Sequence, residues 1–110
     1  MSYNILLSSS FQKTFKGLQK KYPSAVKDLS ALIEKLIDNP VLGTSLGKGC
    51  YKVRLSIASK GKGKSGGARV ITCVKIVNKN VYLLSIYDKS DKETLDDNQL
   101  TMLLEAAGLL

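Results

Sequence analysis

The chain of 110 residues contains no histidine and no tryptophan, and only two cysteines and two prolines. Without histidine, and with Cys50 and Cys73 lacking the spacing of a metal knuckle, no zinc site is expected. Two cysteines are also too few for a disulfide scaffold, so we interpret both as buried thiols of a cytoplasmic protein. The sequence has no apolar run long enough to cross a membrane and no apolar leader, so we expect no membrane partner.

Acidic residues are missing from the middle of the chain. None lies between residues 39 and 87, whereas this segment carries nine lysine and arginine residues, and the whole chain has a net charge of +8. The excess positive charge is therefore concentrated in one segment. Such a block attracts a polyanion, for which nucleic acid is the leading candidate, although a solubilising surface is the alternative.

The first third of the chain predicts one strand and two helices within a single domain that spans 1–110. Residues 3–8 are short and apolar, as in a strand. The capping-box spacing of Ser9 and Gln12, followed by apolar residues at helical intervals, predicts a first helix that begins there and is broken at Tyr22-Pro23. Pro23 suits the first turn of a second helix, which Asn39-Pro40 ends. Because the connection is so short, the two helices should form an antiparallel pair.

The middle of the chain changes to a period of two. In residues 51–57, apolar side chains alternate with Lys52 and Arg54, so one face of this strand is apolar and the other is basic. Residues 69–77 and 81–87 predict two further strands, and 78–80 a tight turn between them. A final helix should begin at Asp96 or Asp97.

These elements define an α+β fold. We expect the N-terminal strand and the antiparallel helix pair to pack on a small, mainly antiparallel sheet, with a helix at the C-terminus.

The segment ASKGKGKSGGAR, residues 58–69, has the glycine spacing of a dinucleotide-binding fingerprint at Gly61, Gly63 and Gly66. That fingerprint requires a helix after the glycines, because the pyrophosphate rests on the helix N-terminus. A strand is predicted there instead, so a nucleotide-binding loop is rejected. We interpret the segment as a hairpin tip whose Lys60, Lys62 and Lys64 either contact phosphates or only keep the tip soluble.

Three motifs in this order of elements carry a family resemblance: YKVR at 51–54, GGARVI at 66–71 and VYLLSIYDK at 81–89. Together they resemble the toxins of RelE/ParE-type bacterial toxin–antitoxin modules, most closely the HigB-like and RelE-like members. The resemblance implies a RelE-like fold and a ribosome-dependent mRNA endonuclease, or mRNA interferase, that needs no metal or cofactor. It also implies a cognate antitoxin partner. A ParE-like DNA gyrase inhibitor and a non-catalytic RNA-binding module are the alternatives.

The resemblance also implies which residues form the site. The catalytic candidates are Lys52, Arg54, Arg69, Tyr87 and Lys89. The candidates for binding RNA or the ribosome are Lys48, Lys60, Lys62 and Lys64.

The chemistry suits these residue types. Attack of a ribose 2′-hydroxyl on the adjacent phosphate needs a base, a proton donor for the leaving oxygen, and cations that stabilise the pentavalent phosphorus. Arg54 and Arg69 are suited to the last task. Tyr87 could orient the nucleotide or exchange a proton. Lys52 or Lys89 could be the donor, so the general base is left unassigned. Asp88 could orient its neighbours or cap the strand end.

Overall fold

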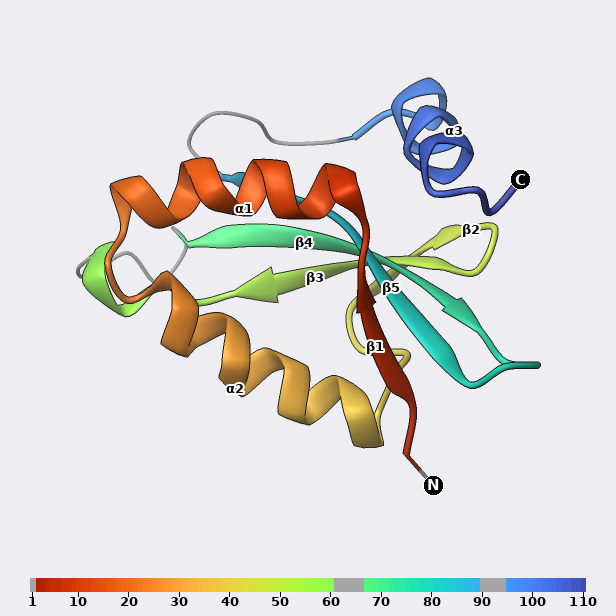
Figure 1. Ribbon diagram of the computed structural model, residues 1–110, viewed down its shortest axis with the longest axis horizontal. Helices are drawn as coiled ribbons and strands as arrows, with labels where there is room; N and C mark the ends of the chain where they lie inside the picture. The colour runs from red at the N-terminus through yellow and green to blue at the C-terminus, as the bar shows by residue number, and fades with distance from the viewer. Residues whose placement is uncertain (1, 61–66, 90–94) are drawn as a thin grey trace.

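The computed structural model describes residues 2–60, 67–89 and 95–110, which form an α+β fold of three α-helices and one five-stranded sheet (Figure 1). The elements in chain order are β1 (Asn4–Leu7), α1 (Ser9–Lys21), α2 (Ala25–Asp38), β2 (Thr44–Gly47), β3 (Cys50–Leu55), the 3-10 helix η1 (Ala58–Lys60), β4 (Ala68–Lys75), β5 (Asn80–Asp88) and α3 (Asp97–Ala106). None of the helices in these ranges is both long and apolar enough to cross a bilayer.

The sheet has the strand order β1-β5-β4-β3-β2. Strands β2 to β5 pair antiparallel with their neighbours, and β1 pairs parallel with β5. The predicted α+β class, the meander of three strands and the C-terminal helix are thus confirmed. The strand β2 was not predicted, because it has only four residues and these are largely polar and mostly exposed.

Serine precedes both N-terminal helices, but only the first has a side-chain cap, and this cap is Ser8 and not the predicted Ser9. The Ser8 hydroxyl caps α1 by accepting a hydrogen bond of 3.0 Å from the Phe11 amide. The second helix starts at Ala25, so the prediction that it begins at Pro23 was wrong by two residues. Pro23 and Ser24 instead form the turn that reverses the chain, so that α1 and α2 run in roughly opposite directions and diverge (Figure 1).

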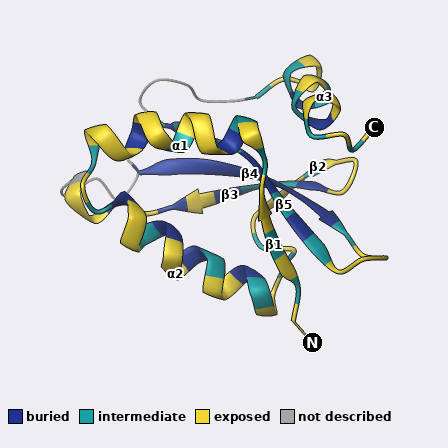
Figure 2. Ribbon diagram, viewed as in Figure 1, coloured by how far each residue is buried: buried dark blue, intermediate teal, exposed yellow. Residues whose placement is uncertain are grey.

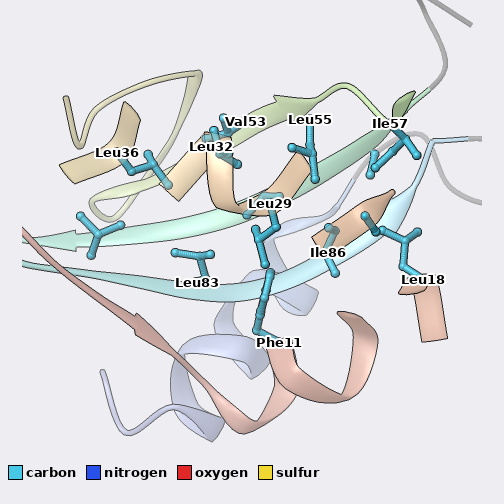
Figure 3. Close-up of a cluster of buried hydrophobic side chains, with 14 of the residues drawn as sticks. Phe11, Leu18, Leu29, Leu32, Leu36, Val53, Leu55, Ile57, Leu83 and Ile86 are labelled. Atoms are coloured by element: carbon cyan, nitrogen blue, oxygen red, sulfur yellow. The ribbon is translucent and has the colours of Figure 1, made fainter. Parts of the chain in front are cut away.

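The main hydrophobic core lies between these helices and one face of the sheet (Figure 3). Leu29, Leu32 and Leu36 recur along one side of α2 and meet Phe11 and Leu18 from α1. Strands β3, β4 and β5 contribute alternate residues to this core. Strand β4 is the most deeply buried, with seven of its eight residues buried (Figure 2).

A smaller core lies on the opposite face of the sheet, where α3 packs. Leu100 and Leu104 of this helix contact a buried cluster that contains Ile71, Leu84 and the two cysteines. A capping box starts the helix, because Asp96 accepts from the Gln99 amide at 2.8 Å and the Gln99 side chain accepts from the Asp96 amide at 3.0 Å. The sheet is therefore covered on both faces, as its apolar β4 requires.

A β-bulge in β5 changes which residues face each core. Cys73 is opposite Tyr82 and Thr72 is opposite Leu83, but Ile71 is opposite Ser85, so Leu84 is an extra residue in the ladder. Strict alternation from Leu83 would send residues 85 and 87 to the helix face. After the bulge, Ile86 faces the main core instead, and Tyr87 packs on the opposite side.

Asp88 at the end of β5 is tied to the C-terminal end of α1. Its carboxylate is 3% exposed, accepts a 2.6 Å hydrogen bond from the Tyr22 hydroxyl and lies 3.3 Å from Lys21 Nζ. A buried carboxylate needs such donors, since an unpaired one carries a large desolvation cost. The Asp88–Tyr22–Lys21 cluster thus fixes the end of β5 against α1.

Replacement of Tyr22 by phenylalanine should therefore lower the free energy of unfolding by about 2 kcal/mol, because Asp88 loses its 2.6 Å hydrogen bond from the Tyr22 hydroxyl. Urea denaturation followed by circular dichroism measures this loss. Tyr51→Phe is the matched control. Tyr51 packs beside the same core, and its hydroxyl makes no hydrogen bond with the described residues. Equal stabilities of the two variants would contradict this account of the cluster.

Candidate active site

Three of the predicted catalytic residues lie side by side across the sheet. Arg54 of β3 is directly opposite Arg69 of β4, and Arg69 is directly opposite Tyr87 of β5. Directly opposite residues of antiparallel strands project from the same face. This Arg54–Arg69–Tyr87 row lies on the face away from α1 and α2, because the neighbouring residues of each strand enter the main core.

The backbones of β3 and β4 lie close together at Arg54 and Arg69. The Val74 amide donates to the Gly49 carbonyl, which makes 49 and 74 a hydrogen-bonded pair. Because such pairs alternate along an antiparallel ladder, 54 and 69 form a non-hydrogen-bonded pair, whose Cα atoms are typically about 4.5 Å apart. Like charges directly opposite each other are destabilising. A bound anion would relieve this repulsion, so the pair is suited to holding a phosphate.

The two arginines differ in how they are held. Arg69 is only 8% exposed, and its Nη1 donates to the Ala68 carbonyl at 3.1 Å. Its other guanidinium donors have no acceptor within residues 2–60, 67–89 and 95–110. Arg54 is exposed. The row therefore combines a fixed cation with a more accessible one.

The backbone at Gly67 requires a glycine, which accounts for one residue of the GGAR motif that ends at Arg69. Its φ is +73°, and a Cβ atom there would lie 2.5 Å from the Leu55 carbonyl oxygen. Only glycine lets the chain enter β4 this close to β3. The Gly67 carbonyl also accepts a 3.2 Å hydrogen bond from the Lys89 amide. Lys89 is thereby placed at the same end of the sheet as Arg69 and Tyr87.

The remaining lysine candidates are spread over the surface. Lys52 lies two residues from Arg54 on the same face of β3 and is half-buried. Lys48 is in the turn before β3, where its Nζ donates to Thr101 of α3 at 3.1 Å. Six residues separate it from Arg54, or about 20 Å along a strand. Its predicted contact with RNA would therefore involve a different part of the surface.

Residues 61–66 of the segment 58–69, which include Lys62 and Lys64, lie outside the described residues, while Lys60 is the last residue of η1. The start of this segment is anchored to α2. The Asp28 carboxylate accepts from the Ala58 amide at 3.0 Å, and the Ser59 amide donates to the Ser24 hydroxyl at 2.8 Å. Sequence reasoning missed this anchor, because it joins residues 30 or more positions apart.

A hollow adjoins each end of the row. One of about 300 Å³ lies between α1 and β5, and its lining includes Lys13, Lys21 and Tyr87. The other, of about 200 Å³, has Arg54 and Lys35 in its lining. Lysines of both helices thus lie at the two edges of the sheet, beyond the ends of the row. The sequence marks these lysines only as exposed helix positions, since their neighbours depend on how the helices pack on the sheet.

The fold and the Arg54–Arg69–Tyr87 row define the class of protein as a small, basic α+β domain. A profile of the family described as "RelE toxin of RelE / RelB toxin-antitoxin system" matches residues 10–110, nearly the whole chain. The chain belongs to the RelE toxin family and is the toxin component of a toxin–antitoxin system.

A solved structure confirms the fold. The free state of an Escherichia coli RelE toxin with two arginines replaced by alanine superposes with a TM-score of 0.59. The two sequences are 15% identical, and the match covers 98% of this chain and 96% of that one.

Replacement of Arg54 by glutamine should raise the free energy of unfolding by about 0.5 kcal/mol at low salt, because it removes the repulsion with Arg69. The gain should fade as salt screens the charges. Thermal unfolding at several salt concentrations tests this, with Lys16→Gln on the exposed side of α1 as the control for net charge. A loss of stability in the Arg54 variant would mean that the two guanidinium groups do not repel each other in the folded protein.

Proposed function

We propose that this toxin is a ribosome-dependent endonuclease that cleaves mRNA in the ribosomal A site. The observation that carries the proposal is the Arg54–Arg69–Tyr87 row, in which two opposed cations adjoin a phenol. Membership of the RelE toxin family and the segment between residues 39 and 87, which lacks acidic residues, support it. Translation takes place in the cytoplasm, so that is where the protein would act.

The row suits cleavage by the 2′-hydroxyl of the RNA. When this hydroxyl attacks the adjacent phosphate, negative charge builds up on the nonbridging oxygens of the pentavalent phosphorus. Arg69 and Arg54 would bind these oxygens, and a guanidinium can hold two of them at once. The bond to the 5′-oxygen then breaks, which leaves a 2′,3′-cyclic phosphate and a 5′-hydroxyl.

The proton transfers would be carried out by the groups that border the phosphate. With no histidine in the chain, these are the Tyr87 phenol and the amines of Lys52 and Lys89. The Asp88 carboxylate is assigned a different task, because it is on the helix face of β5 with Tyr22 and Lys21 as partners. Asp88 would hold the strand end, and with it Tyr87, in place beside Arg69.

The same positive surface would serve the two macromolecular partners. The ribosome and the mRNA present phosphates to it, and the lysines of residues 48–64 would add contacts that position the protein without reading sequence. The cognate antitoxin would inhibit the toxin by covering this surface with acidic side chains.

Arg69→Ala should lower the rate of mRNA cleavage by at least about a hundredfold, because it removes charge stabilisation of the transition state. Primer extension on a reconstituted translation reaction, with and without ribosomes, maps the cuts and their rate. Lys79→Gln is the control, because it removes one positive charge at the far end of the β4–β5 hairpin. Equal rates for both variants would remove Arg69 from the site.

If the wild-type protein left mRNA intact in actively translating reactions, the endonuclease proposal would be wrong. The supercoiling activity of purified DNA gyrase would then be the next assay.

Binding to ribosomes should weaken by about tenfold or more between 50 and 200 mM monovalent salt, since several phosphates are neutralised at once. Sedimentation with ribosomes at increasing salt measures this dependence. Affinity that stays constant over the range would contradict a phosphate-binding surface.

A further inference from the structure

The two cysteines, which are 23 positions apart in the sequence, face each other across the sheet. Cys50 of β3 is directly opposite Cys73 of β4. Like 54 and 69, they form a non-hydrogen-bonded pair, because the adjacent pair of Gly49 and Val74 is hydrogen-bonded. The Cα atoms of such pairs are typically about 4.5 Å apart, and disulfides span Cα distances of about 4.4 to 6.8 Å. A disulfide could therefore form without a change of strand register.

The two thiols are free and fully buried, and both belong to the same buried cluster. Cys50 Sγ donates a hydrogen bond of 3.6 Å to the Lys48 carbonyl oxygen. The neighbouring Cys50 thiol and the nearby Lys75 lower the pKa of Cys73 to about 7, although burial opposes this. The neighbouring Cys73 thiol, followed by burial, raises the pKa of Cys50. Cys73 is therefore the more readily ionised thiol and the better nucleophile.

The cover over the thiols is α3, whose Leu100 and Leu104 pack against them. The bond from Lys48 Nζ, in the β2–β3 turn, to Thr101 is the one hydrogen bond that joins α3 to the strands or their turns in the described parts of the chain. A short helix with so few hydrogen bonds to its neighbours belongs to the less stable part of a fold and can detach from the sheet by local unfolding. Opening of α3 would expose the pair to a small oxidant while the β3–β4 ladder stays intact.

We propose that Cys50 and Cys73 form a reversible thiol–disulfide site that reacts with low-molecular-weight disulfides, and that α3 controls access to it. The inference does not depend on the proposed endonuclease activity.

The reaction with oxidised glutathione proceeds by two exchanges. The Cys73 thiolate attacks one sulfur of the glutathione disulfide, which forms a mixed disulfide and releases one glutathione thiolate. Cys50 then loses its proton, its sulfur attacks the Cys73 sulfur, and the second glutathione leaves. Two thiols of the protein are oxidised, and one glutathione disulfide is reduced to two thiols. A thiol reductant reverses both steps.

The test is to incubate the folded protein with oxidised glutathione, quench the reaction with acid and determine the intact mass. We expect a loss of two hydrogen atoms, a nonreduced peptide pair that links residues 50 and 73, and full reversal by dithiothreitol. Cys73→Ala is the control and should not lose the two hydrogens. A stable glutathione adduct on the wild-type protein, a disulfide between two chains, or two thiols that remain free in the folded state would each overturn the proposal.

The role of α3 is tested separately with Thr101→Val, which removes the hydrogen bond to Lys48 and keeps the side chain's shape. Oxidation of this variant should be about fivefold faster than that of the wild-type protein, since the loss of one hydrogen bond makes opening easier. Thr44→Val, on the exposed strand β2, should oxidise at the wild-type rate. Equal rates for Thr101→Val and the wild-type protein would mean that α3 does not control access.

Discussion

The register of β5 against β4 is the constraint on which the rest of this structure depends. Leu84 is an extra residue in that ladder, and its insertion changes the face on which all later residues of β5 project. Without it, Tyr87 would be buried under α1, and Ile86 and Asp88 would lie on the opposite side. One residue thus completes the main core with Ile86, anchors the strand end through Asp88 and brings Tyr87 into line with Arg69.

The site depends on stability that is supplied elsewhere in the fold. Two arginines opposite each other disfavour the folded state, and burial of Arg69 adds a desolvation cost. The surrounding structure compensates for both. The buried strand β4 is packed between two cores, and the Asp88–Tyr22–Lys21 cluster holds the adjacent strand end. The cost of keeping two like charges together is thus offset by hydrophobic packing on the far side of the same strands.

Much of the fold could be predicted from the sequence because it follows from local periodicity. The alternation in residues 51–57 was enough to place Lys52 and Arg54 on one face, and the structure confirms this. The position of Tyr87 could not be derived in the same way, because residues 81–87 are apolar at nearly every position and show no alternation that would reveal the bulge. The family resemblance, and not the residue pattern, singled out Tyr87.

Other features depend on contacts between distant segments. Strand β2 is defined by its pairing with β3 and not by its own four residues. The proximity of Cys50 and Cys73 follows from the register of β3 and β4, which the spacing in the sequence does not indicate. The partners of Asp88 lie 66 and 67 positions earlier in the chain. Sequence periodicity carries no information about such pairings, since they arise only when helices and strands are packed together.

The position of β5 between β1 and β4 determines when the candidate site can be completed during the protein's own synthesis. The first strand pairs with β5, which is the last strand to be made, so β1 has no partner until about four-fifths of the chain exists. Contacts between such distant segments also form slowly, because a long loop must close first. A nascent chain that still lacks β5 has both arginines but no tyrosine beside them and no anchor at Asp88. The Arg54–Arg69–Tyr87 row is therefore complete only after about four-fifths of the chain has been made.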